Sequence, residues 1–351
     1  MAKRFCCPEC FGDRALRDQI FPSLNPHYGR CDFCEADGVP LLKPEKLSEY
    51  FELLVNAYKP DENGKSLVEW MKGDWQLFDR MDIFRAKDLL REILNNGQIV
   101  RRNFKPSANH VSRGLAQWDK LRGEMMYSNR WFFEPIDLDR LGELLDMLIA
   151  SSPLPQIWYR ARICRIDKVF PIEEMGAPPK GHTSHGRANP AGIPYLYLGS
   201  TPETAIAEIR PHTGENASVA DFRIVSPEIK AVDLRNPRKF VSPFILSDAD
   251  DVGQLLADLP LLERLGEELT KPVLPTGAAI DYISSQYLCE FIKKRGFDGV
   301  VYRSSVGDGF NLALFDPKKA VARSVMRYEV TKVSVEIAAA NKSYNYTSGQ
   351  Y

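Results

Sequence analysis

Hydrophobic residues follow a helical period between residues 41 and 150. After Pro44, apolar residues recur at i, i+3, i+4 and i+7, which places them on one face of a helix. They are Leu47, Tyr50, Phe51 and Leu54. Caps and breakers predict further helices: one opened by Ser66 with Glu69, one at 86–94 before Asn95-Asn96-Gly97, and one over 138–148 opened by Asp137. The stretch 104–133, with Pro106, Gly114 and Gly123, gives no clear assignment.

The pattern changes after Ser151-Ser152-Pro153-Leu154-Pro155, a composition typical of a linker. Short alternating stretches then predict strands at 157–165, 193–198, 299–303 and 312–315. Helices are predicted from Thr201 to Arg210, with Ser200 and Glu203 at capping-box spacing, and from Ser285 to Arg295 before Gly296. Strands with a few helices between them indicate an α+β fold.

The chain is long enough for more than one domain, with 351 residues, of which 44% are hydrophobic and 26% charged. We predict four segments: a cysteine-containing segment at 1–40, a helical accessory domain at 41–150, an α+β domain at 156–325 and a polar tail at 332–351. No apolar run approaches the roughly 20 residues that span a bilayer, and the basic N-terminus lacks the apolar region of a signal peptide. A net charge of −1 argues against nucleic-acid or membrane partners. We expect a cytoplasmic protein.

Five of the seven cysteines lie within the first 34 residues. Cys7-Pro-Glu-Cys10 and Cys31-Asp-Phe-Cys34 are two C-x-x-C pairs about twenty residues apart, the spacing of a zinc-ribbon-like site. Each pair presents two thiolates to one point, and four thiolates complete the tetrahedral shell of a structural Zn²⁺. Cys6 is left over, and His27 is an alternative ligand. Metal binding would supply the folding free energy that so short and polar a segment lacks.

Three segments of the C-terminal half carry the candidate chemistry. A Gly- and Pro-rich loop, 186–192, holds Arg187 and leads into a strand with Tyr197. Arg grips phosphate in bidentate fashion. Glu208 lies in the predicted helix within a small apolar stretch, and residues 296–305 end in Arg303-Ser304-Ser305. Taken singly, each residue is typical of a surface loop, a half-buried strand, a helix face or a turn. Only the combination indicates a site.

Together these segments resemble the RES (Arg-Glu-Ser) domain family in residue type and order, over roughly 156–325. In that family the Arg of a Gly-Arg-x-Asn loop, a Tyr at the end of the next strand, a helical Glu and a late Ser form the active site. The matching positions are Arg187, Tyr197, Glu208 and Ser304. The resemblance implies substrate-binding roles for Asn189, for Ser305, and for an Arg of the first strand. That Arg is Arg160 or Arg162, with Arg162 favoured.

Family membership would imply a fold like that of ADP-ribosyltransferases and NAD as a substrate, cleaved between nicotinamide and ribose. The acceptor would be water, phosphate or a protein side chain, and the protein would be the toxin of a toxin–antitoxin pair. The residues themselves show no G-x-G-x-x-G between a strand and a helix and no P-loop, so NAD is not expected as a redox cofactor. A non-enzymatic alternative is a zinc-ribbon protein that only binds ADP-ribose.

The order of segments also resembles a RES branch with a HEPN-related helical module. Many HEPN domains are RNases with Arg and His four to six residues apart on one helix. The nearest pair here, Arg102 and His110, has seven residues between its members, and Pro106 interrupts it. We therefore expect no RNase activity. The helical module is expected to bind a partner, either a neutralising antitoxin or a target protein.

Overall fold

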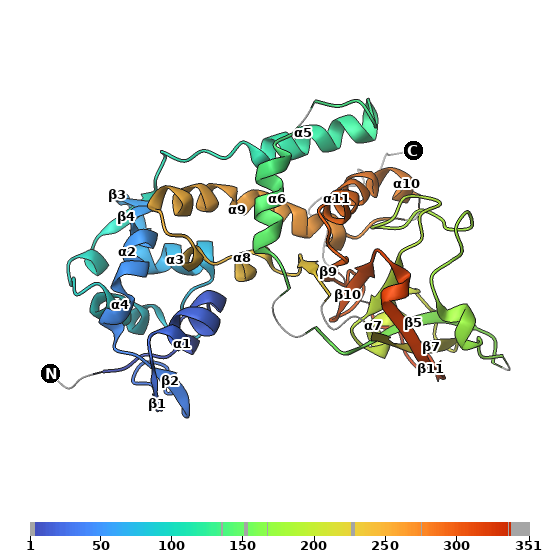
Figure 1. Ribbon diagram of the computed structural model, residues 1–351, viewed down its shortest axis with the longest axis horizontal. Coiled ribbons are helices and arrows are strands. Elements are labelled where there is room, and N and C mark those ends of the chain that lie inside the picture. Colours follow the sequence, from blue (N-terminus) through green and yellow to red (C-terminus); the bar gives the residue numbers. More distant parts are fainter. Residues whose placement is uncertain are drawn as a thin grey trace, which may run out of the picture.

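A computed structural model describes residues 4–134, 136–150, 154–166, 168–225, 229–274, 276–335 and 337 (Figure 1). The α-helices are α1 (Phe21–Ser23), α2 (Ser48–Asn56), α3 (Leu67–Trp75), α4 (Ile83–Ile93), α5 (Gly114–Tyr127), α6 (Leu138–Met147), α7 (Pro202–Glu208), α8 (Pro237–Phe240), α9 (Ala249–Thr270), α10 (Ala278–Asp281) and α11 (Ile283–Lys294). The strands are β1 (His27–Gly29), β2 (Val39–Leu41), β3 (Tyr58–Ser66), β4 (Asn103–Pro106), β5 (Ile157–Cys164), β6 (Leu196–Gly199), β7 (Asn216–Ile224), β8 (Ala231–Asp233), β9 (Gly299–Arg303), β10 (Phe310–Leu314) and β11 (Ala320–Glu329).

The helical half forms largely as its apolar period predicts. Leu47, Phe51 and Leu54, at the start of α2 and within it, are buried. The capping box at the start of α3 is confirmed, since the backbone N–H of Ser66 donates to Glu69 at 2.9 Å. Asp137 caps α6 by accepting from the backbone N–H of Arg140 at 2.9 Å. The structure confirms these two caps because each depends only on residues three positions apart in the sequence.

The stretch that the sequence left unassigned holds β4 and α5. Gly114 and Gly123 are read from sequence as breakers, yet α5 contains both. A Cβ at Gly114 would lie 2.8 Å from the Leu261 side chain on α9, so this glycine permits close helix packing rather than ending a helix. Because β4 lies between Arg102 and His110, no helix carries that pair in this part of the chain.

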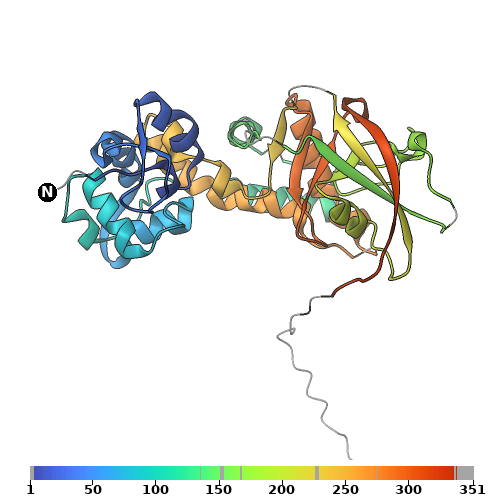
Figure 2. The same cartoon turned by 90° about the horizontal axis from the view of Figure 1, so that it is seen from below.

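Within the described residues, the C-terminal half contains a seven-stranded sheet in the order β11-β7-β5-β6-β10-β9-β8. Neighbouring strands are antiparallel except β8 and β9. Helices accompany the sheet (Figure 2), which agrees with the predicted α+β class. The strands β5 and β6 pair only at Tyr159 and Gly199, so the sheet opens on one side of this pair.

Helix α9 joins the two halves of the molecule and was not predicted. It runs for 22 residues with Pro260 inside it, and Asp248 caps it by accepting from the N–H of Asp250 at 2.6 Å. It extends from the helical half to the sheet (Figures 1 and 2). A continuous hydrophobic core reaches through it from Cys6 to Phe315. The predicted boundary near residue 150 therefore separates two stretches of sequence that share one core.

Several predicted bounds need correction. Thr201, not Ser200, caps α7, accepting from the N–H of Thr204 at 3.1 Å. The helix ends at Glu208, because Arg210 has φ +50° and cannot continue it. Strand β6 begins at Leu196 rather than at residue 193. Residues 151–153 of the predicted linker, and 336 and 338–351 of the predicted tail, lie outside the described residues. No helix in the described ranges is both long and apolar enough to cross a membrane.

Candidate active site

Glu208 stands at the end of α7, where two side chains from other elements orient its carboxylate. Ser304, after β9, donates its hydroxyl to Glu208 Oε1 at 2.7 Å. Asn311 on β10 is buried and donates Nδ2 to the same oxygen at 2.6 Å. Two donors on one oxygen fix the direction of the carboxylate. The pocket lining described below includes Glu208 and Asn311, so this anion faces any bound ligand.

The loop that carries Arg187 is held by the hydroxyl of Tyr197. This hydroxyl donates to Asn189 Oδ1 at 2.7 Å and accepts from the backbone N–H groups of Ala188 at 2.9 Å and Asn189 at 3.2 Å. Asn189 Nδ2 donates to the carbonyl oxygens of Ser184 and Pro190, at 3.0 and 2.9 Å. Burial raises the pKa of Tyr197, so the hydroxyl stays protonated and able to donate. The Asn189 side chain is thus occupied within the loop.

The tight approach of this loop to Tyr197 requires glycine at position 186. A Cβ there would lie 2.4 Å from Asn189 Oδ1 and 2.6 Å from the Tyr197 hydroxyl, closer than real Cβ atoms come. We expect Gly186→Ala to break the Tyr197–Asn189 hydrogen bond and to displace the Arg187 loop, lowering kcat/KM for the substrate about tenfold or more, mainly through a higher KM. Steady-state kinetics will measure this, with Gly176→Ala as the control, because that position has open space and an ordinary negative φ of −70°. Equal loss in both variants would contradict the argument.

The Arg187 side chain lies between the turn after α9, the β9–β10 turn and the start of α11. Its Nη1 donates to the carbonyl oxygen of Lys271 at 2.6 Å, and Nη2 donates to the Ser305 hydroxyl at 3.4 Å. The guanidinium lies 5.4 Å from the ring centroid of Tyr282, between α10 and α11. None of these contacts neutralises the charge. An anionic group of a ligand can therefore pair with Arg187.

Of the two candidate arginines on β5, the structure places Arg160 on the pocket and not Arg162. Arg160 lines the pocket, and its Nη1 donates to the Tyr197 carbonyl oxygen on β6 at 3.3 Å. Burial and the neighbouring Arg162 lower the pKa of Arg160, while no carboxylate among the described residues offsets this. Its Nε is buried without a hydrogen-bond partner in the described part of the chain. Arg162 instead stacks 4.2 Å over the Phe170 ring and donates to the Glu174 carbonyl oxygen. This geometry favours Arg160 as the arginine of β5 that meets a ligand, whereas the sequence alone favoured Arg162.

A pocket of about 360 Å³ brings these groups together. Its lining includes Arg160, Arg187, Tyr197, Glu208 and Ser305 from the predicted set. Ser304 is not part of the lining but bonds Glu208. His185, Tyr282 and Asn311 also line the pocket, and the sequence patterns did not predict them. Asn311 lies six residues after the segment 296–305 and within the stretch 156–325 that resembles the family, whereas nothing in the sequence marks Tyr282 or His185.

The four cysteines of the two C-x-x-C pairs come together at the other end of the molecule. Their sulfur atoms all lie within 4.8 Å of one another, with 3.3 Å between Cys7 and Cys34 and 3.4 Å between Cys10 and Cys31. Four converging thiols are the donor set that tetrahedral zinc prefers. Cys6 points elsewhere, toward the Leu42 carbonyl oxygen, and His27 packs edge-on against Phe5. Neither belongs to the cluster.

The fold is α+β, and its pocket contains Arg160 and Arg187, neither of which has an ion-pair partner in the described residues. The Glu208 carboxylate, oriented by Asn311, lines the same pocket. The RES domain matches residues 157–335, and the chain belongs to the RES domain family. Among solved structures, the chain is similar to one titled crystal structure of the M. tuberculosis MbcT-MbcA toxin-antitoxin complex. The identity is 14%, the TM-score is 0.29, and the match covers 54% of this chain and 92% of that one. No curated protein matches the chain.

Proposed function

We propose that this protein cleaves the bond between nicotinamide and ribose in NAD. The observation that carries the proposal is the pocket in which Glu208, oriented by Ser304 and Asn311, lies with Arg160 and Arg187. NAD has a pyrophosphate, which arginines bind, and a ribose that becomes cationic as the bond breaks. The two arginines of the pocket are suited to the pyrophosphate, and the Glu208 carboxylate is suited to the cationic ribose. Membership of the RES family supports the same substrate.

Each residue has a role in this proposal. Arg160 and Arg187 bind the pyrophosphate, and Ser305 holds Arg187. The Tyr197 and Tyr282 rings pack against the planar rings of the substrate, while Asn189 shapes the loop. As the C–N bond breaks, its electron pair leaves with nicotinamide, which departs neutral and needs no general acid. The Glu208 carboxylate stabilises the oxocarbenium-like ribose that remains, as carboxylates do in glycoside hydrolysis. An acceptor then adds to the ribose carbon and loses its proton.

The test is nicotinamide release from NAD by the purified full-length protein, with and without inorganic phosphate. Release in buffer alone indicates water as the acceptor, and release that depends on phosphate indicates phosphorolysis. Labelling of a protein by NAD would instead identify a side-chain acceptor. Binding of ADP-ribose with no release under any of these conditions would overturn the proposal and favour a binding module.

The resemblance to RES toxins further implies a toxic activity held in check by an antitoxin.

Arg160 and Arg162 provide a matched pair for testing pyrophosphate binding. We expect Arg160→Met to raise KM for NAD about tenfold or more, because it removes a charge that lines the pocket. Arg162→Met removes the same charge two residues along the same strand, and we expect its KM to stay within about twofold of wild type. Steady-state kinetics on both variants will decide. A rise in KM for Arg162→Met alone would return the role to Arg162.

A further inference from the structure

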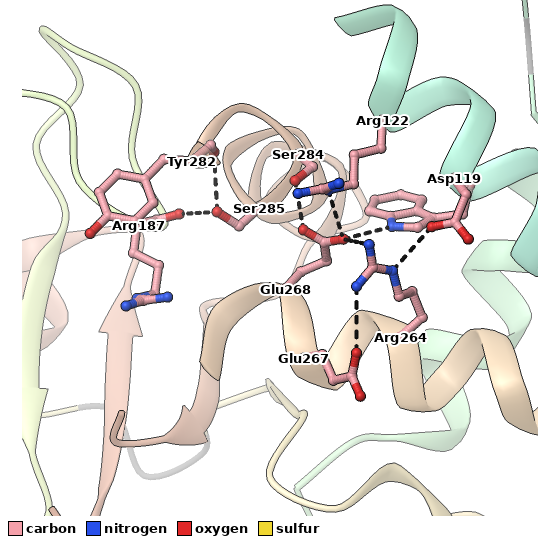
Figure 3. A network of polar contacts seen from close by, with 10 residues as sticks. Asp119, Arg122, Arg187, Arg264, Glu267, Glu268, Tyr282, Ser284 and Ser285 are labelled. Carbon is pink, nitrogen blue, oxygen red and sulfur yellow. Dashed lines mark hydrogen bonds and ion pairs between the residues drawn. The ribbon is translucent and has the colours of Figure 1, made fainter. Parts of the chain in front are cut away.

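The start of helix α11 holds the Arg187 loop by its backbone. Ser285, which is fully buried, donates its hydroxyl to the Arg187 carbonyl oxygen at 2.6 Å. The next residue, Gln286, donates Nε2 to the Gly186 carbonyl oxygen at 2.8 Å. These two bonds fix the peptide that carries Arg187 without using its guanidinium. The position of α11 therefore sets where Arg187 enters the pocket (Figure 3).

The residue before this pair contacts α9, the helix that joins the two halves of the molecule. Successive residues of a helix point about 100° apart, so Ser284 faces away from the loop. Its hydroxyl donates to Glu268 Oε2 at 2.6 Å, and Ser284 is fully buried. Glu268 belongs to α9, which packs against both α5 and α11. One carboxylate thus ties the start of α11 to α9.

The other oxygen of Glu268 faces cationic and polar groups of α5 and α9. The Trp118 indole N–H donates to Oε1 at 3.2 Å. The guanidinium groups of Arg122 and Arg264 lie 3.5 Å from the same oxygen (Figure 3). The Glu268 side chain is only 5% exposed, and burying a charge costs free energy. These partners offset that cost. Removing one partner of such a cluster leaves the others unpaired in a dry environment.

We infer that Glu268 is a positioning residue for the NAD site. It fixes Ser284 and with it the start of α11, and α11 fixes the Arg187 loop through Ser285 and Gln286. The inference rests on the proposed function, because it takes Arg187 as a ligand of the pyrophosphate. It assigns the helical half a part in substrate binding, since α5 supplies Trp118 and Arg122 to the Glu268 cluster. A displacement of about 1 Å in such a positioning chain is enough to cost up to about 10²-fold in rate.

Glu267 is the matched control, because it is the adjacent residue of the same helix and carries the same charge. Its side chain is exposed, and its one ion pair within the described residues is with Arg264, at 3.4 Å. In the full-length protein, we expect Glu268→Gln to raise KM for NAD about tenfold while kcat falls about threefold or less, as when uniform binding is lost. Glu267→Gln should stay within about twofold of wild type. A merely structural role for Glu268 would lower the amount of folded protein and leave KM unchanged.

A second variant covers the case in which Glu268→Gln does not fold. Gln286 is only partly buried, and Gln286→Glu replaces its donor with an oxygen that repels the Gly186 carbonyl. We expect the same rise in KM, and a matching loss of ADP-ribose affinity by calorimetry. Suppose that wild type binds ADP-ribose or releases nicotinamide, and that Gln286→Glu and any folded Glu268→Gln keep the KM of Glu267→Gln. The positioning inference alone then fails. If wild type does neither, the proposed function fails, and the inference with it.

Discussion

Replacing Glu208 with glutamine is expected to lower the turnover of NAD at least about 100-fold, equivalent to about 3 kcal/mol of transition-state stabilisation. Glutamine keeps the size of the side chain and an oxygen that can accept from Ser304 and Asn311. It lacks the negative charge that balances the cationic ribose as nicotinamide leaves. We expect the loss in kcat, with KM changed about threefold or less, because the charge acts mainly as the bond breaks. Nicotinamide release under single-turnover conditions will measure it.

Glu203 supplies the control for this variant. It lies in the first turn of the same helix, is exposed, and stands outside the pocket lining. Glu203→Gln should therefore retain wild-type turnover within about twofold. A Glu208→Gln variant as active as Glu203→Gln would remove Glu208 from the chemistry. It would leave the two arginines as a phosphate-binding site only.

Loss of the metal is expected to destabilise the N-terminal half. We propose that the four cysteines bind one structural zinc ion, whose binding free energy is then folding free energy. Cys7, Cys10 and Cys31 are buried within the same core as Phe11, so unpaired thiolates there would be costly. Cys7→Ser should lose most of the zinc, and its Tm should fall by about 5 °C or more, as expected for a loss of several kcal/mol. Elemental analysis and calorimetry will measure both quantities.

Cys6 is the control, because it is the adjacent, equally buried cysteine and stands outside the cluster. Its thiol donates to the Leu42 carbonyl oxygen, a bond that a serine hydroxyl also makes. Cys6→Ser should keep about one zinc per chain. Wild-type protein purified without any bound metal, and unaffected by a chelator, would contradict the zinc site altogether.

Local signals in the sequence predicted what neighbouring residues decide. The capping box at Ser66 and the cap at Asp137 form as expected, because their partners lie three residues away. The two C-x-x-C pairs were also readable, since each pair is a short turn with fixed geometry. The RES resemblance located the loop around Arg187 and the helix that ends at Glu208, and the RES domain match covers the same part of the chain.

Packing between distant segments was not readable from the sequence. Gly114 suggested a break, but its neighbour across the interface is Leu261, 147 positions away, and that contact makes glycine favourable within a helix. Helix α9 was not predicted from the sequence. It contains Pro260, and its buried residues are held by packing against both halves of the molecule. Residues that only tertiary contacts bring to the pocket, Tyr282 above all, left no pattern to detect.

The sequence by itself thus determined the α+β class, the four-cysteine cluster and the family of the C-terminal half, because these depend on composition, short spacings and the order of residue types along the chain. It could not decide between Arg160 and Arg162, which lie two residues apart on one strand. Only the tertiary structure places Arg160, and not Arg162, on the pocket. The reason is that their partners come from distant segments: Arg160 reaches the Tyr197 carbonyl oxygen, whereas Arg162 contacts Phe170 and Glu174. The same holds for Glu268, whose partners come from α5, α9 and α11. Such a cluster exists only once the helices pack and exclude water from its charges.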